Sequence, residues 1–142
     1  MPNRAVVFVS EARADLADPT LVAIMADAVR FNRDVGVSGV TLFDGSRFLA
    51  YMEGPPDGLD VAFSRALGAS SHSHLIELAR GRVGQRRVPY WPMRLVNVEA
   101  GTLPQLLRAD WTGFVQRVEQ GGVPATAMEL LTSLVQPLAE AA

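Results

Sequence analysis

Two apolar runs separated by a three-residue turn constrain the fold of this chain more than any other feature. The runs cover residues 39–43 and 47–53, and the turn between them is Asp44-Gly45-Ser46. A short glycine-containing loop between apolar runs is a strong local signal for a β-hairpin. Gly54-Pro55-Pro56 ends the second strand, because proline has no amide hydrogen to donate to a ladder. The rest of the chain must therefore be arranged around an antiparallel strand pair.

The remaining elements follow from their periodicity. Residues 5–10 form an apolar run typical of a central strand, with Phe8 in its middle, and a helix begins near residues 18–20 and ends beside Asn32. After the hairpin, residues 59–67 predict a second helix, residues 74–83 a strand, and a fifth strand ends near Val98. The order β-α-β-β-α-β with one additional strand predicts an α+β, ferredoxin-like fold.

The C-terminal part of the chain is expected to complete this fold. Residues 103–118 and 128–138 both show helical apolar periodicity, and Gly121-Gly122-Val123-Pro124 separates them. A ferredoxin-like sheet has both of its helices on one face, so this helix pair is expected to cover the other face; the alternative is a dimerisation or partner surface. We therefore divide the chain into a sheet domain, residues 1–98, and a helical pair, residues 99–142.

Composition excludes several classes of function. The 142 residues are 49% hydrophobic, with 13 basic and 15 acidic side chains and a net charge of -2, so no basic surface for nucleic acid is indicated. The absence of cysteine excludes disulfides, thiol catalysis and thiolate metal sites. No apolar run approaches the roughly 20 residues of a membrane span, and the N-terminus lacks the layout of a secretion signal. We expect a cytoplasmic protein without membrane contact.

Five ordered motifs resemble the BLUF family of blue-light sensors that use FAD. They read VFVS in the first strand, FNRDVGVSGV after the first helix, FLAYMEGP on the hairpin, SHSHL, and RRVPYWPM before the fifth strand. The resemblance covers roughly residues 4–98. It implies the ferredoxin-like fold already read from the periodicity, an FAD site between the two helices, and a role in signal transduction.

The resemblance also implies which residues form the FAD site. In the family, a tyrosine, a glutamine and one or two asparagines contact the polar edge of the flavin ring. The tyrosine position is Phe8 here, the glutamine position is Ala50, and Asn32 is retained. The full cofactor-binding set that the resemblance implies is Phe8, Ile24, Phe31, Asn32, Ala50, Trp91 and Met93. The Asp and Arg that commonly precede the family's histidine are replaced by Ala69 and Ser71.

These replacements bear on the photocycle, which in the family requires electron and proton transfer from the tyrosine and rearrangement of the glutamine amide. Phe8 has no phenolic hydrogen and Ala50 has no amide. Tyr51 follows Ala50 directly, so in a regular strand its side chain points to the opposite face. Tyr90 is expected to point away from the face of its neighbour Trp91 for the same reason, so neither tyrosine is expected to replace the missing one. We expect FAD binding to be weak or absent, with Phe31 partly filling the cleft.

Rival sites are poorly supported. His72 and His74 could share a strand face as metal ligands, but no third ligand completes a motif, and His72 is expected in a loop. Arg80, Arg82, Arg86 and Arg87 form a basic cluster that is expected to be a solvated loop, and Glu53 is expected to be a turn or cap residue rather than a general base. No nucleophile elbow, phosphate loop or carboxylate pair is present, so we predict that the chain is not an enzyme.

The function predicted from the sequence is a BLUF-like sensory or regulatory module without photochemistry. It is expected to act through a protein partner or through self-association as a homo-oligomer. Two alternatives stay open at this point: an FAD-binding photoreceptor with an altered photocycle, and a small-ligand binder or enzyme that uses the cleft between the helices.

Overall fold

The protein is built on a five-stranded sheet in the order β4-β1-β3-β2-β5. The computed structural model describes residues 3–13, 18–69, 72–86, 88–114 and 126–141. The strands are β1 (Asn3–Ala12), β2 (Ser38–Phe43), β3 (Arg47–Gly54), β4 (His72–Gly84) and β5 (Arg94–Asn97). Neighbouring strands are antiparallel except β2 and β5, which are parallel. The predicted α+β, ferredoxin-like arrangement with one additional strand is confirmed.

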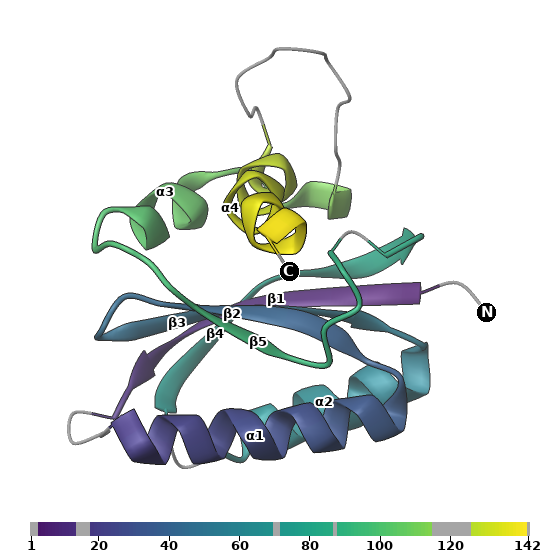
Figure 1. Cartoon of the computed structure of the whole chain (residues 1–142). Coiled ribbons are helices and arrows are strands. Elements are labelled where there is room, and N and C mark those ends of the chain that lie inside the picture. The colour runs from purple at the N-terminus through teal and green to yellow at the C-terminus, as the bar shows by residue number, and fades with distance from the viewer. Residues whose placement is uncertain (1–2, 14–17, 70–71, 87, 115–125, 142) are drawn as a thin grey trace.

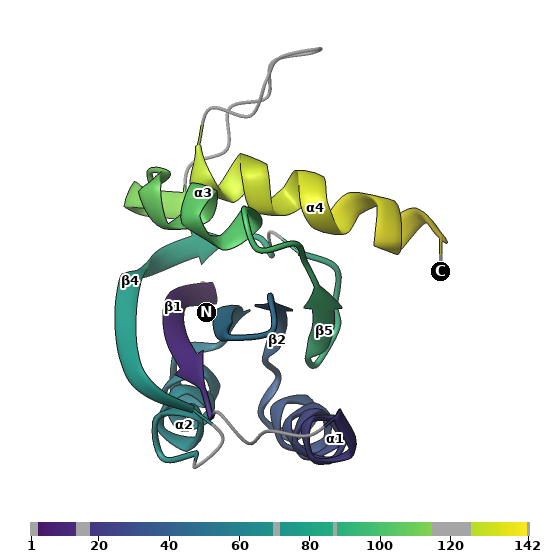
Figure 2. The ribbon, with the colours of Figure 1, turned by 90° about the vertical axis from the view of Figure 1, so that its left-hand side faces the viewer.

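Helices cover both faces of this sheet (Figure 1). On one face lie α1 (Asp18–Val35) and α2 (Pro56–Leu67), the two helices of the β-α-β-β-α-β unit. On the other face lie α3 (Thr102–Arg108), the short 3-10 helix η1 (Thr112–Phe114) and α4 (Ala127–Ala141). Figure 2, viewed from the side, shows the sheet as the middle of three layers. The predicted cover of the second face by the C-terminal helices is therefore present.

The hairpin that joins β2 and β3 has the predicted turn. Gly45 has a φ of +98°, which glycine adopts without the steric cost of a side chain. Oδ1 of Asp44 accepts hydrogen bonds from the amides of Ser46 and Arg47, at 2.9 and 2.8 Å, and from the Ser46 hydroxyl at 3.1 Å. The Asp44 carboxylate thus takes the place of the backbone carbonyl groups that amides in a tight turn lack as partners.

This turn predicts a pH dependence of stability. Burial acts to raise the pKa of Asp44, but the hydrogen bonds from Ser46 and Arg47 and the charge of Arg47 together hold the pKa below 3.8. A carboxyl whose pKa is lower in the folded state stabilises the fold above its unfolded pKa, and that contribution is lost as the pH falls through the folded pKa. Asp44→Asn should flatten the fall in unfolding free energy below about pH 4, measured by urea titration. Equal slopes for Asp44→Asn and the parent protein would contradict the assignment.

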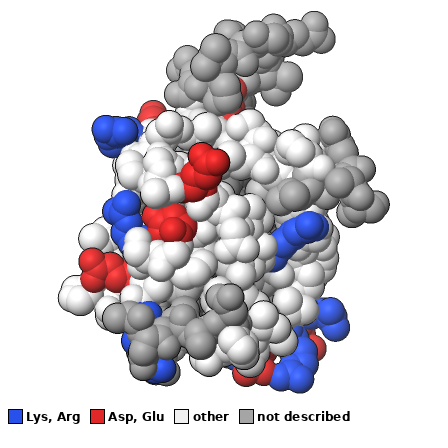
Figure 3. Space-filling model, turned by 60° about the vertical axis from the view of Figure 1, so that its left-hand side comes forward, with Lys and Arg blue, Asp and Glu red and all other residues white. Residues whose placement is uncertain are grey.

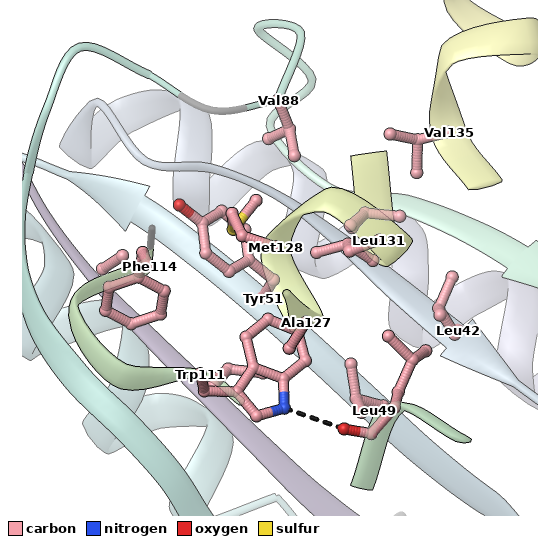
Figure 4. Close-up of a cluster of buried hydrophobic side chains, with 14 of the residues drawn as sticks. Leu42, Leu49, Tyr51, Val88, Trp111, Phe114, Ala127, Met128, Leu131 and Val135 are labelled. Atoms are coloured by element: carbon pink, nitrogen blue, oxygen red, sulfur yellow. Dashed lines mark hydrogen bonds between the residues drawn. The ribbon is translucent and has the colours of Figure 1, made fainter. Parts of the chain in front are cut away.

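A hydrophobic core fills the space between the sheet and the C-terminal helices (Figure 4). Tyr51 of β3 is fully buried there, with its ring edge-on to Phe114 at a centroid distance of 5.8 Å. The indole Nε1 of Trp111 donates to the carbonyl oxygen of Leu106 at 3.0 Å. The other core residues shared by sheet and tail are Ala5, Val7, Val40, Leu42, Leu49, Val83, Val88, Leu103, Ala127, Met128, Leu131 and Val135.

The first C-terminal helix is shorter than predicted. The expected helix over residues 103–118 ends at Arg108, where Ala109 takes an extended conformation with a ψ of 163°. Oδ1 of Asp110 then accepts the amide of Thr112 at 2.9 Å and starts the separate 3-10 turn of η1. Side-chain capping by aspartate competes with helix continuation, which the apolar spacing alone does not reveal. Residues 115–118 of the predicted helix lie outside the described residues.

Candidate functional site

A cavity of about 470 Å³ lies between α1, α2 and the sheet, a size typical of small-ligand sites. Its wall comes from both helices, from β1, β2, β3 and β4, and from the segment that enters β5. The lining residues are Phe8, Ile24, Met25, Asp27, Ala28, Asn32, Thr41, Phe48, Ala50, Met52, Ala62, Arg65, Ala66, Gly68, Ala69, His72 and Met93. Five of the seven residues predicted from the sequence therefore line one cavity.

The floor of the cavity is a row of side chains across three strands. Phe8 of β1 lies opposite Ala50 of β3, and Ala50 lies opposite Thr41 of β2. Phe8 is 3% exposed and Ala50 4% exposed, so the two positions form a buried hydrocarbon surface. Alternation along β3 sends Tyr51 to the opposite face, where its hydroxyl donates to Oε1 of Glu53 at 2.8 Å. Tyr51 therefore does not reach the cavity, as its parity predicts.

The polar corner of the cavity lies where α1 meets β2 and the start of β5. Asn32 is 4% exposed, and its Nδ2 donates to the carbonyl oxygen of Pro92 at 2.8 Å. Because a carbonyl only accepts, this contact orients the amide and turns Oδ1 away from Pro92; Oδ1 has no protein partner within the described part of the chain. Beside it, the Thr41 hydroxyl donates to the sulfur of Met93 at 3.1 Å and keeps its lone pairs.

His72 is a cavity residue that the sequence analysis misplaced. It is the first residue of β4, not a loop residue, because residues 72 and 12 pair at the end of the β1–β4 ladder. Its Nε2 lies 2.7 Å from the carbonyl oxygen of Ala66 and must donate there, and its Nδ1 lies 2.6 Å from the hydroxyl of Ser10. His72 thereby connects the C-terminal end of α2 to the sheet. The rings of Phe8 and Phe48 lie 6.3 and 6.2 Å from its ring.

Phe31 and Trp91 are the two predicted site residues that do not line the cavity. Phe31 packs against the hydrophobic cluster between the sheet and α2, which includes Phe8 and Phe63. The guanidinium of Arg65 lies 4.9 Å from the centre of the Phe31 ring, so Phe31 does not fill the cleft as predicted. Trp91 packs against the core on the opposite face of the sheet, with the Arg94 guanidinium over its ring. The pairing of β5 with β2 starts only at Arg94. The segment before it is therefore not bound to the alternation of a strand, and Met93 and Trp91 lie on different faces of the sheet.

Two further predictions about polar side chains are wrong. Glu53 is fully buried rather than a turn residue, and its Oε2 accepts the amide of Val88 at 3.1 Å. Arg86 is partly buried rather than solvated: its guanidinium donates to the Ser38 hydroxyl and to the carbonyl oxygens of Gly36 and Glu53. Together they fasten the β4–β5 connection to the end of the hairpin. Arg87 lies outside the described residues.

Among the described residues there is no metal centre and no membrane-spanning helix, and the face in Figure 3 shows no nucleic-acid surface. Within the described residues, no three His, Asp or Glu side chains gather to hold a metal ion. On the face shown in Figure 3, acidic and basic side chains are interspersed and form no basic patch. The described helices each fall short of the length and apolarity needed to cross a lipid bilayer.

Comparison with known proteins points to one family. The family model described as "BLUF: Sensors of blue-light using FAD" matches residues 4–94. The dark-state structure of BlrB, a BLUF protein, is 25% identical, with a TM-score of 0.69 over 99% of this chain and 98% of that chain. Klebsiella pneumoniae BlrP1 with FMN and cyclic diGMP is 26% identical, with a TM-score of 0.62 over 67% of this chain.

Some of these similar structures are much longer than the present chain. The chain covers 26% of the BlrP1 chain and 34% of a bacterial light-regulated adenylyl cyclase. The cyclase is 18% identical with a TM-score of 0.64, which shows the shared fold alone. No functionally curated protein matches the sequence.

Proposed function

Since this chain belongs to the BLUF family of blue-light sensors that use FAD, we propose that it is a sensory module that has lost the family's photochemistry and regulates a partner protein. A BLUF domain senses and is not itself catalytic, which agrees with the absence of catalytic motifs from the sequence. The observation that carries the proposal is the hydrocarbon floor of the cavity. Phe8 and Ala50 are cross-strand neighbours on that floor, at the positions that the family resemblance assigns to the tyrosine and the glutamine.

The residues present fit FAD at one corner of the cavity and not along the floor. The buried Asn32 amide, with its unpartnered Oδ1, suits the polar edge of a flavin ring. Phe8 and Ala50 offer neither a donor nor an acceptor. Each hydrogen-bond partner missing from a buried polar edge costs about 1–3 kcal/mol, so the two together cost very roughly 2–6 kcal/mol. At about 1.4 kcal/mol per tenfold, the affinity for FAD falls by a factor of about tens to ten-thousands.

A partner protein or a second copy of the chain is the proposed receiver of the signal. The surface offers a place for it along β4, a long strand at the edge of the sheet whose outer side pairs with no described strand. Unpaired strand edges are ready sites for chain association. Ile76 adds an apolar side chain there, 61% exposed.

The absorption spectrum of the purified protein tests the proposal. We expect protein expressed with excess riboflavin to be colourless, to bind added FAD weakly, and to show no shift of flavin absorption under blue light. Flavin absorption that shifts under blue light would instead establish the altered photoreceptor. Flavin that binds tightly but does not respond would show a ligand-binding module. Size-exclusion chromatography with light scattering measures self-association in the same sample.

A further inference from the structure

No described strand pairs with the outer edge of β4. This strand is the first in the sheet order and runs from His72 to Gly84, with β1 along its inner edge (Figure 2). Edge strands are commonly protected from association by charged side chains and by β-bulges, which disturb the pattern that a second strand must match. β4 has both features, and their arrangement decides what can pair with it.

Three β-bulges interrupt the alternation of side chains along β4. Its pairing with β1 shifts three times, and at each shift β4 contains one residue more than β1. At such a bulge, two consecutive residues face the same side of the sheet. The doubled positions are residues 73–74, 78–79 and 83–84, and they face the C-terminal helices.

The order of faces along β4 is symmetric about the point between Leu78 and Ala79. Between the bulges, side chains alternate, and the neighbours of Phe8 and Phe63 face α1 and α2. The residues of β4 that face this side are Leu75, Glu77, Arg80 and Arg82, and the others from 73 to 84 face the C-terminal helices. The sequence of faces therefore reads the same in both directions along the strand.

We propose that two copies of the chain pair their β4 strands antiparallel about a two-fold axis between Leu78 and Ala79, which joins the two sheets into one. In this register every residue from Ser73 to Gly84 lies opposite a residue that faces the same side of the sheet, as antiparallel pairing requires. The bulges, which disturb pairing with a regular strand, coincide with those of the second copy. The inference rests on the proposed function and names the second copy as the direct partner of β4.

The charges along the edge are complementary in this register. Glu77 of one copy lies opposite Arg80 of the other, and the symmetry forms this pair twice. Opposite charges across two strands are favourable, whereas like charges directly opposite are unfavourable. Within one chain, the Arg80 guanidinium donates to Oε1 of Glu77 at 2.8 and 3.0 Å and lies 3.5 Å from Oδ1 of Asp60. The dimer brings two such clusters together into one network of ion pairs.

The exposed apolar side chain of β4 also gains a partner. Ile76 is 61% exposed and lies opposite Gly81 of the other copy in the proposed register. Gly81 has no side chain, and a Cβ at this position would lie 3.8 Å from the ring of Phe114. Ile76 can therefore cover the glycine backbone beside that ring, which removes apolar surface from water.

Two other registers also match the faces, but over fewer residues. An axis at Ile76 places Arg80 opposite His72, and an axis at Gly81 places Arg80 opposite Arg82. Neither register forms a pair of opposite charges from a glutamate and an arginine, and the second brings like charges together. The charges therefore select the register that uses the whole of β4.

Charge reversal followed by sedimentation equilibrium tests the inference. We expect the parent protein to be a dimer. Glu77→Arg and Arg80→Glu should each weaken the dimer about tenfold or more, because each places like charges opposite each other twice. An equimolar mixture of the two variants should form a heterodimer within about threefold of the parent affinity, since opposite charges again meet across the interface while each chain keeps its like-charged pair.

Further variants control for charge and for folding. Glu99→Arg, after β5, and Arg33→Glu, on α1, reverse the same charges at exposed positions away from β4 and should leave the dimer unchanged. Circular dichroism melts identify a variant that loses the dimer by unfolding. The chain has no cysteine, so a short thiol crosslinker gives a second measurement: it should join Glu77→Cys to Arg80→Cys in a mixture far more than it joins either variant to itself.

Each other outcome overturns a distinct statement. A monomeric parent protein overturns the dimer, and a dimer that both charge reversals leave unchanged joins through another surface. A mixture that associates no better than its two components overturns the register. Absorption spectra of the same samples test the proposed function separately: flavin that shifts under blue light overturns that function and leaves the dimer standing, whereas a colourless monomer overturns the dimer alone.

Discussion

Replacing Phe8 by tyrosine and Ala50 by glutamine together should raise the affinity for FAD by a factor of about tens to ten-thousands. Both side chains would extend from the cavity floor, on neighbouring strands and in register, toward the space that the Asn32 amide already borders. They would supply the two hydrogen-bonding groups that the hydrocarbon floor lacks. The cavity of about 470 Å³ has room for a larger side chain at position 50. Fluorescence quenching of FAD on titration with protein measures the gain.

A matched control separates this effect from a general effect of added polarity. Phe63→Tyr adds the same hydroxyl on the same side of the sheet, on a ring whose centroid lies 5.5 Å from that of Phe8. Phe63 is not among the residues that line the cavity. This variant should bind FAD like the parent. If the double variant gains nothing over the parent, the ring does not enter the cavity and the family relationship bears on shape alone.

Trp111→Ala should lower the free energy of unfolding by about 3–5 kcal/mol, the typical cost of removing a buried tryptophan. Trp111 is 5% exposed within the core that joins the sheet to α3 and α4, and its indole satisfies the Leu106 carbonyl at the end of α3 (Figure 4). Truncation leaves a cavity and removes that donor in one step. Urea denaturation followed by circular dichroism measures the change.

Two further variants serve as comparisons for the loss of stability in Trp111→Ala. Trp111→Phe retains most of the packing but not the indole donor, so it should lose less than Trp111→Ala. Tyr90→Ala, at a position 54% exposed, should change stability by less than about 1 kcal/mol. A loss below 1 kcal/mol for Trp111→Ala would mean that the C-terminal helices are not part of the cooperative core. The predicted division at residue 98 would then describe two separately stable units.

Local chemistry predicted most of the architecture. The glycine turn at residues 44–46, the alternation along β3 and the helical stripes are all short-range patterns. Each produced the element that was expected, except that the stripe over residues 103–118 produced only the shorter helix α3. Alternation also sufficed to put Phe8 and Ala50 on one face and Tyr51 on the other, because the side-chain period of a strand is 2.

Long-range contacts limited what the sequence could predict about the site. His72 has partners 62 and 6 residues away, and Arg86 reaches a hydroxyl 48 residues away, so nothing in their neighbourhoods identifies them as structural. The end of α3 depends on hydrogen bonds of the Asp110 side chain and of the Trp111 indole. Both residues lie inside the predicted helix over residues 103–118, whose apolar spacing does not reveal these bonds.

The amino-acid sequence by itself determined the order of the elements, the family, and the apolar identity of positions 8 and 50, because these depend on residue identity and on spacing along the chain. Only the tertiary structure decided which way the Asn32 amide faces, which side of the sheet receives Trp91, and that Glu53 is buried. Those features depend on a carbonyl 60 residues from Asn32 and on a connection with no regular pairing before Arg94. Such contacts exist only once distant segments have packed together.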